Sequence, residues 1–190
     1  MTLDDLLPPL QKRVFVYLAE SEPQTIREIS KGVKADYSAT HRAFKKLESK
    51  KMLQVVAQKT YNNNEYGRYW ISEVGAYVAL CEGVKSSKLL QRALRFYPEN
   101  QNLHCLLEVS PILGIKGFDV ACLALLNKGK IEQKDISAVI TAQMQDKISV
   151  EDANKIVEII KKYPSIYVSF DAEMQRRNRN YEEFRKSYSK

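Results

Sequence analysis

The sequence contains few of the residues that break up a chain or cross-link it. Among 190 residues there are 7 glycines, 6 prolines and 3 cysteines. No apolar run approaches the roughly 20 residues that a membrane span needs. The first residues include acids where a secretion signal carries positive charge, so we expect no signal peptide. The odd number of cysteines fits a reducing compartment. These absences predict a folded cytoplasmic protein that does not contact a membrane.

Motifs for catalysis and cofactor binding are also missing. There are 2 histidines, and no Ser-His-Asp set, glycine-rich phosphate loop or paired-carboxylate motif accompanies them, so we expect neither an enzyme nor a cofactor. Cys81, Cys105 and Cys122, with His104, could in principle form a metal or redox sensor. Lone cysteines on apolar helical faces are more often inert packing, so we expect no metal site.

Positive charge is concentrated in two segments of the chain. The net charge is +7 overall. Residues 31–59 hold eight lysines or arginines against two acids, and residues 174–190 hold six against two, so the remainder is slightly acidic. Such a distribution makes an anionic partner plausible. The basic tail could be a solvated helix, a second contact to phosphates or a flexible arm.

The first 84 residues predict helices around a hairpin. Thr25 and Glu28 have the spacing of a capping box, and Gly32 marks the end of the short helix that follows. The polar cluster "NNNEYG" predicts a turn between two strands. The expected elements are a helix over 9–20, a short helix from Thr25 to Gly32, a helix over 38–51, strands over 53–61 and 68–72, and a helix from Glu73.

The helix expected over 38–51 has two different faces. At 100° per residue, its apolar side carries Thr40, Ala43, Phe44 and Leu47, with the stem of Lys51 beside them. The opposite side carries Ser38, Arg42, Lys45 and Ser49, flanked by His41 and Lys46. Lysine-rich helix faces are commonly just solvated. A small polar start followed by long cationic side chains is also what a helix needs to enter a major groove.

The order of these elements resembles the winged helix-turn-helix domain of prokaryotic transcription regulators of the MarR and ArsR types. The resemblance rests on "TIREISKGVKADYSATHRAF", on "YSATHRAFKKLESKKML" and on "RYWISEVGAYV", and it covers about residues 8–84. The chain departs from the family at Lys51-Met52, where a glycine commonly ends the recognition helix. The resemblance implies a partner, double-stranded DNA, with base reading by Ser38, His41 and Arg42.

The wing of that domain type often touches phosphates or enters the minor groove. A plain hairpin turn is the alternative for the segment "YNNNEYGR". The full set of expected DNA-binding residues is Ser38, Ala39, His41, Arg42, Lys45, Lys46, Asn63, Asn64 and Arg68.

The second half of the chain predicts helices only and resembles no family that we recognise. We expect helices over 86–97, 102–113, 118–129, 133–147, 149–163 and 171–190. Ser149, with Asp152 three residues on, predicts a capped start, and Pro164 predicts a break. The segment "FDVACLALL" at 118–126 is apolar almost all round, which favours a bundle centre or an interface. The expected architecture is therefore mainly α with a small hairpin wing. A DNA-binding domain over 1–84 precedes an all-helical domain over 85–190 that supplies homodimerisation and could bind a protein partner or small-molecule effector. The alternative is a winged-helix protein–protein adaptor that does not read DNA.

Overall fold

A computed structural model describes residues 7–61, 64–113, 132–145 and 148–188. In these ranges the protein is mainly helical, with one two-stranded antiparallel sheet, as the sequence predicts for the coarse fold class. The helix expected over 118–129 and the wing residue Asn63 lie outside the described residues. None of the described helices is both long enough and apolar enough to cross a membrane.

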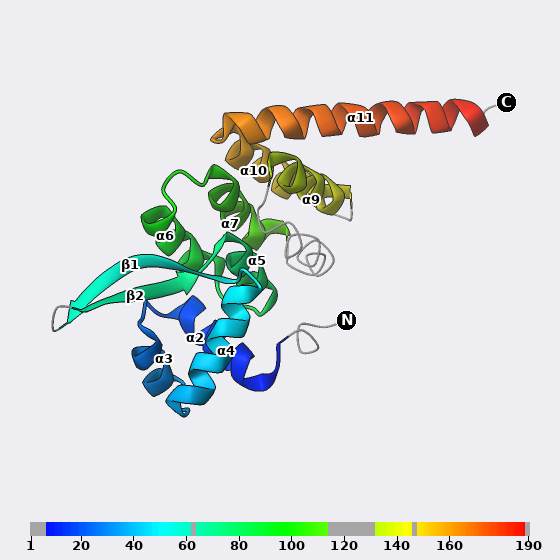
Figure 1. The fold of residues 1–190 in the computed structure, drawn as a ribbon. Coiled ribbons are helices and arrows are strands. Elements are labelled where there is room, and N and C mark those ends of the chain that lie inside the picture. The colour runs from blue at the N-terminus through cyan, green and yellow to red at the C-terminus, as the bar shows by residue number, and fades with distance from the viewer. Residues whose placement is uncertain (1–6, 62–63, 114–131, 146–147, 189–190) are drawn as a thin grey trace.

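The elements before residue 85 occur in the predicted order. They are α2 (Pro9–Glu20), α3 (Ile26–Gly32), α4 (Tyr37–Ser49), β1 (Leu53–Tyr61), β2 (Asn64–Ile71) and α5 (Glu73–Cys81). Figure 1 shows α2, α3 and α4 on one side of the hairpin. The capping box before α3 is confirmed, because the Thr25 side chain accepts from Glu28 N while Glu28 accepts from Thr25 N.

The hairpin is longer than the sequence predicts. Tyr61 pairs with Asn64, and the ladder continues to Leu53 opposite Ile71, with a bulge between Val55 and Ala57. The expectation that 64–67 belong to the turn and that the second strand begins at 68 is therefore wrong, and residues 62 and 63 lie outside the described residues. Asn and Gly are poor strand formers in isolation, but cross-strand hydrogen bonding overrides that preference. Gln24, in the connection between α2 and α3, forms an antiparallel bridge with Tyr69 at the edge of β2 that faces away from β1.

Three helices end with the same hydrogen-bonded turn. At the end of α4, Met52 N donates to Leu47 O (3.0 Å) and Lys51 N donates to Glu48 O (2.8 Å). This is a Schellman motif, and it places Lys51 at φ 58°. The expectation that the Lys51 stem packs inside is wrong, because this residue lies beyond the helix and is exposed. The equivalent turns after α3 and α5 place Lys34 and Gly83 at positive φ.

The elements that the structure describes after residue 84 are all helices. They are α6 (Ser86–Phe96), α7 (Gln101–Leu113), α9 (Gln133–Gln145), α10 (Val150–Lys161) and α11 (Pro164–Tyr188). The capped start at Ser149 is confirmed, since its side chain accepts from Asp152 N (3.1 Å). The last helix begins at Pro164 rather than at 171, because a proline that lacks N–H fits the first turn of a helix. Figure 1 shows α11 continuing well beyond the helices on which it packs.

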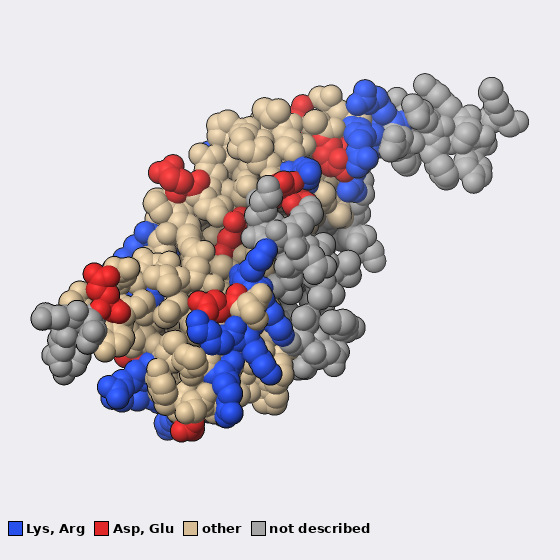
Figure 2. Space-filling view, in the orientation of Figure 1, with Lys and Arg blue, Asp and Glu red and all other residues tan. Residues whose placement is uncertain are grey.

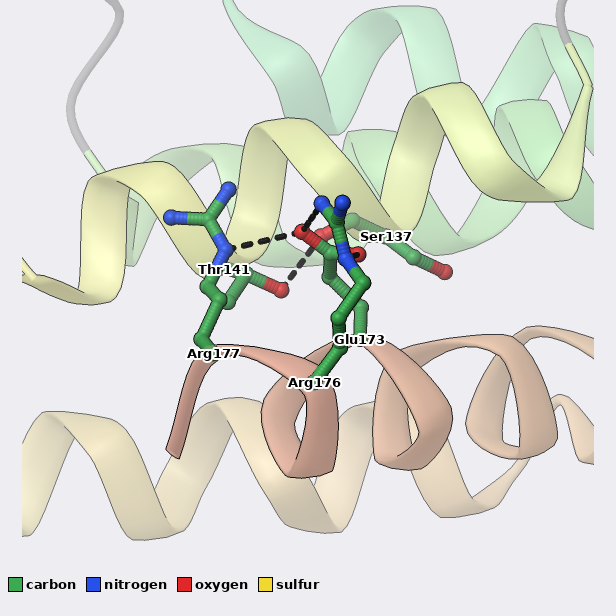
Figure 3. A network of polar contacts seen from close by, with 5 residues as sticks. All are labelled: Ser137, Thr141, Glu173, Arg176 and Arg177. Carbon is green, nitrogen blue, oxygen red and sulfur yellow. Dashed lines mark hydrogen bonds and ion pairs between the residues drawn. The ribbon is translucent and has the colours of Figure 1, made fainter. Parts of the chain in front are cut away.

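Helix α11 packs on α9, whose buried residues include two small polar ones. Ser137 and Thr141 are buried and hydrogen-bond to carbonyl groups of their own helix, Gln133 O (2.9 Å) and Ser137 O (2.6 Å). Beside them, Glu173 accepts from Arg176 at both carboxylate oxygens (2.9 and 2.8 Å) and from Arg177 (2.8 Å), as Figure 3 shows. These arginines lower the pKa of Glu173 to about 2.

Helix α6 ties the two halves of the chain together. Arg92 donates to Ala19 O (3.0 Å) and Glu20 O (2.8 Å), at the end of α2. Tyr97, just after α6, donates to Ile71 O (2.6 Å), and its ring stacks on Trp70. One cluster of buried hydrophobic residues runs from Leu7 to Phe170. The predicted division into domains at residue 84 stays a prediction.

The positive φ at Lys51 yields a stability prediction. A side chain in the left-handed region costs roughly 1–2 kcal/mol that glycine does not incur. We expect Lys51→Gly to raise the free energy of unfolding by about 0.5–1 kcal/mol, measured by urea denaturation. The matched control is Lys50→Gly, at φ −80°, which removes the same charge one residue earlier. It should lower stability by about 0.5–1 kcal/mol. Equal losses in both variants would contradict the account.

The arginine pairs of Glu173 predict a pH dependence. The pKa of Glu173 is lowered from 4.5 to about 2, so its contribution is complete above about pH 4.5 and is lost as the pH falls through 2. The side chain is 16% exposed, and pairs within one helix are weak. Glu173→Gln should therefore cost only about 0.5–1 kcal/mol at pH 7.

That difference between Glu173→Gln and the parent should shrink as the pH approaches 2, as followed by thermal unfolding between pH 2 and 7. The matched control is Glu158→Gln, which removes a single ion pair, to Lys161 (2.7 Å), that is more exposed than the pairs of Glu173. This control should cost no more than about 0.5 kcal/mol. A loss for Glu173→Gln that is the same at pH 2 and pH 7 would show that the carboxylate charge is not what stabilises the contact.

Candidate nucleic-acid interface

Helix α4 is fixed at its start by a cap and along its length by an apolar face. The Asp36 side chain accepts from Ala39 N (3.0 Å), and the buried Thr40 hydroxyl donates to Asp36 O (2.8 Å). Ala43, Phe44 and Leu47 are buried, as the sequence predicts. The ring of Phe44 meets Tyr69 of β2 edge to face, with the ring centroids 4.5 Å apart. One side of α4 is therefore committed to the core.

The end of α4 is fastened to the start of α5. Ser72, the N-cap of α5, donates from its side chain to Lys51 O (2.6 Å) and from its backbone to Met52 O (2.8 Å). The same hydroxyl accepts from Gly75 N (3.0 Å). A Cβ atom at Gly75 would lie 2.3 Å from Met52 O, so only glycine permits this approach. We call this contact the α4–α5 junction.

The outward side of α4 is basic. Ser38, Arg42, Lys45 and Lys46 are exposed, while Ala39 is half-buried on one flank. Figure 2 shows Lys and Arg side chains gathered over α4. The acid nearest to them in the helix is Glu48, whose carboxylate lies 2.7 Å from Lys45 Nζ. This pairing raises the pKa of Lys45.

An aromatic side chain at the start of α4 was missed by the sequence reasoning. Tyr37 is 50% exposed, and its ring centroid lies 6.1 Å from that of the half-buried His41. The sequence predicts a helix that begins at Ser38, one residue after Tyr37, whereas α4 begins at Tyr37. Its i, i+4 spacing to His41 was the signal that could have placed it on the helix.

A hollow lies between the basic side of α4 and the first turn of α2. It has a volume of about 420 Å³, and the residues that line it include Pro8, Leu10, Gln11, Arg42, Lys45 and Lys46. We call it the α2–α4 hollow. None of the described residues that line it is acidic. The sequence gives no pattern for this feature, because its two walls are about thirty residues apart.

Arg68 is separated from the basic side of α4. Side chains alternate along a strand, so Arg68 and Trp70 share one face of β2 while Tyr69 takes the other. Tyr69 packs against Phe44 of α4, and Trp70 packs against Phe96 of α6, with the ring centroids 5.6 Å apart. Arg68 accordingly lines a cavity of about 370 Å³ with Arg95 and Phe96.

Of the two asparagines in the predicted site, the structure describes one. Asn63 lies outside the described residues, and Asn64 is the first residue of β2, opposite Tyr61. The structure therefore brings together Ser38, Ala39, His41, Arg42, Lys45 and Lys46, and it does not bring Arg68 to them.

Other titratable groups lie away from this surface. Burial raises the pKa of Glu73, and a hydrogen bond with Asn100 partly offsets it. This carboxyl group lines a polar cavity of about 530 Å³ between the starts of α5, α7, α9 and α11. Burial also raises the pKa of the Cys105 thiol to about 12, so the thiolate is scarce at neutral pH. Within the described ranges, no group of three or more His, Cys, Asp or Glu residues could hold a metal ion.

Comparison of the chain with family models, curated proteins and solved structures returns no match. The inference about function therefore rests on the geometry and charge of α4 and of the elements that hold it.

The α4–α5 junction predicts unequal costs for two glycine substitutions. Gly75→Ala forces a methyl group onto Met52 O, which is backbone and cannot move aside cheaply. We expect it to lower the free energy of unfolding by about 2–4 kcal/mol. The control is Gly83→Ala, where φ is +81° but the space is open. It should cost only about 1–2 kcal/mol. Chemical denaturation of both variants measures the difference, and a milder effect at Gly75 than at Gly83 would contradict the described contact.

Proposed function

We propose that the protein is a sequence-specific DNA-binding transcription regulator in which α4 enters the major groove. The observation that carries the proposal is the outward side of α4, where an exposed serine is followed by exposed arginine and lysine residues on a helix whose other side is buried. A B-DNA major groove is wide enough for one α-helix. In this proposal residues 8–84 act as a winged helix-turn-helix domain.

The roles of the side chains follow from their reach and charge. Ser38 and Ala39 are small enough to let the helix start approach base edges. Arg42 has the planar, multi-donor group that matches a guanine edge or a phosphate. Lys45 and Lys46 are point charges and suit phosphates. A phosphate bound by Lys45 would compete with the Glu48 carboxylate, which lies 2.7 Å from Lys45 Nζ.

His41 lies on the flank of α4 beside Tyr37 and can add a contact to a base or a phosphate. Asn63 and Asn64 remain in the proposal as wing contacts, because the wing of such a domain often touches phosphates or enters the minor groove. We leave Arg68 out of the DNA contacts, since its side chain lines the cavity facing α6.

Homodimerisation is part of the proposal. One recognition helix reads only a few base pairs, and a two-fold pair doubles the site that is read. We assign dimerisation to the helices after residue 84, and the same region could take a protein partner or an effector. A two-fold symmetric preferred DNA sequence supports pairing, and a preference confined to one short half-site counts against it.

Substitutions in α4 test the proposed reading of DNA. On the duplex that the parent prefers, Arg42→Ala should weaken binding by about 1–3 kcal/mol and relax specificity at one position. Lys45→Ala should weaken binding to preferred and scrambled duplexes alike. It should also reduce the slope of log K against log salt concentration by about one, as expected for the loss of one phosphate contact. Fluorescence anisotropy titrations at several salt concentrations measure both effects.

The matched control for Lys45→Ala is Lys155→Ala in α10. Lys155 is likewise exposed and ion-paired within its helix, to Glu151 (2.6 Å), but it lies on a different part of the molecule. It should bind DNA as the parent does. If Arg42→Ala and Lys45→Ala also bind as the parent does, the basic side of α4 is only a solvated surface. An adaptor that contacts other proteins then becomes the better proposal.

A further inference from the structure

The α2–α4 hollow begins at a helix N-terminus whose N-cap residue, Pro8, makes no capping hydrogen bond in the described part of the chain. No acid occurs in the first turn of α2. Pro8 and Pro9 have no N–H, so the donors of this helix end that have no partner within the helix are the backbone N–H groups of Leu10 and Gln11. No acidic side chain of this 12-residue helix therefore balances the partial positive charge at its N-terminus.

A buried polar side chain lines the same hollow. Gln11 is only 6% exposed, and its Oε1 has no hydrogen-bond partner in the described part of the chain. A buried polar atom without a partner is unfavourable for folding, so it calls for a function or a ligand. The amide nitrogen of the same side chain is a donor that suits an anionic oxygen.

The opposite wall supplies three cations. Arg42, Lys45 and Lys46 all line the hollow, and of these Lys45 is already paired with Glu48. The wall also includes Ala39 and Ala43, which leave an apolar floor between the charges. Uncapped N–H groups, an amide and cations around an apolar floor suit a phosphate with an attached sugar.

We infer that the α2–α4 hollow binds one phosphodiester group of the DNA backbone. This inference rests on the proposed DNA-binding function and extends it to a second element, α2. The bound phosphate sits at the start of α2 while the outward side of α4 faces the bases. It thereby fixes the depth and the register of α4 in the groove. Gln11 acts here as a positioning residue for the phosphate.

The test is a pair of substitutions at Gln11, measured with the full chain and the duplex that the parent prefers. Gln11→Glu keeps the shape and places a negative charge where the phosphate binds. We expect about ten-fold weaker binding near 0.15 M salt and a salt slope reduced by about one. The matched control is Gln133→Glu, at the first residue of α9, which makes the same change at another helix start. It should bind within about two-fold of the parent.

A second variant separates binding from folding. Gln11→Met keeps the volume but removes the unpartnered amide, so its melting temperature should equal or exceed that of the parent. Its DNA affinity should nevertheless fall about three- to ten-fold, because the donor to the phosphate is lost. A residue with a purely structural role does not produce higher stability together with weaker binding.

The possible outcomes are distinguishable. If the parent binds no duplex, the proposed function fails and this inference fails with it. If the parent binds and both Gln11 variants bind within two-fold of it, the hollow holds no phosphate while the proposed function stands. If Gln133→Glu weakens binding as much as Gln11→Glu does, the effect is one of overall charge, and the site is rejected.

Discussion

The α4–α5 junction is the contact on which the arrangement of the basic surface depends. The carbonyl oxygens of Lys51 and Met52, just after α4, accept hydrogen bonds from Ser72. Gly75 lies so close to Met52 O that no larger side chain fits there. A helix held only by its apolar side could still slide or rotate on the core. The junction fixes its end to the chain that leaves the hairpin. The exposed lysines and arginines therefore have a defined position relative to β1 and β2.

Further contacts link this junction to the rest of the chain. Ile71, one residue before Ser72, accepts from Tyr97, and Trp70 packs between the hairpin and α6. A movement of α6 would therefore shift Ile71 and Ser72, and through Ser72 it would shift the end of α4. In the proposed regulator, these contacts connect the helical half with the reading helix.

Local signals in the sequence predict much of the fold. The bounds of α2 and β1 match the expected ranges, and the caps at Thr25 and Ser149 are confirmed, because capping depends on residues three apart. The extent of the hairpin turn and the start of α11 differ from the expected ones. Asn64 to Gly67 have low strand propensity but pair with β1, and Pro164 was read as a break although it starts a helix.

The candidate site was predictable only where it lies on one element. The buried and exposed sides of α4 follow from its periodicity, and the structure places Thr40 and Phe44 inside and Arg42 outside as expected. The position of Arg68 depends on which face of β2 meets α6, which no local pattern states. The α2–α4 hollow combines Gln11 with Lys46, and only the packing of two helices brings them together.

Selection of bound sequences from a random pool of duplex DNA, at near-physiological salt, tests the central claim most directly. The account predicts an enriched motif a few base pairs long in each half-site, repeated with two-fold symmetry. Sequence-independent binding that disappears as salt is raised would mean that the basic side of α4 neutralises phosphates without reading bases. No retention of any duplex would contradict the account.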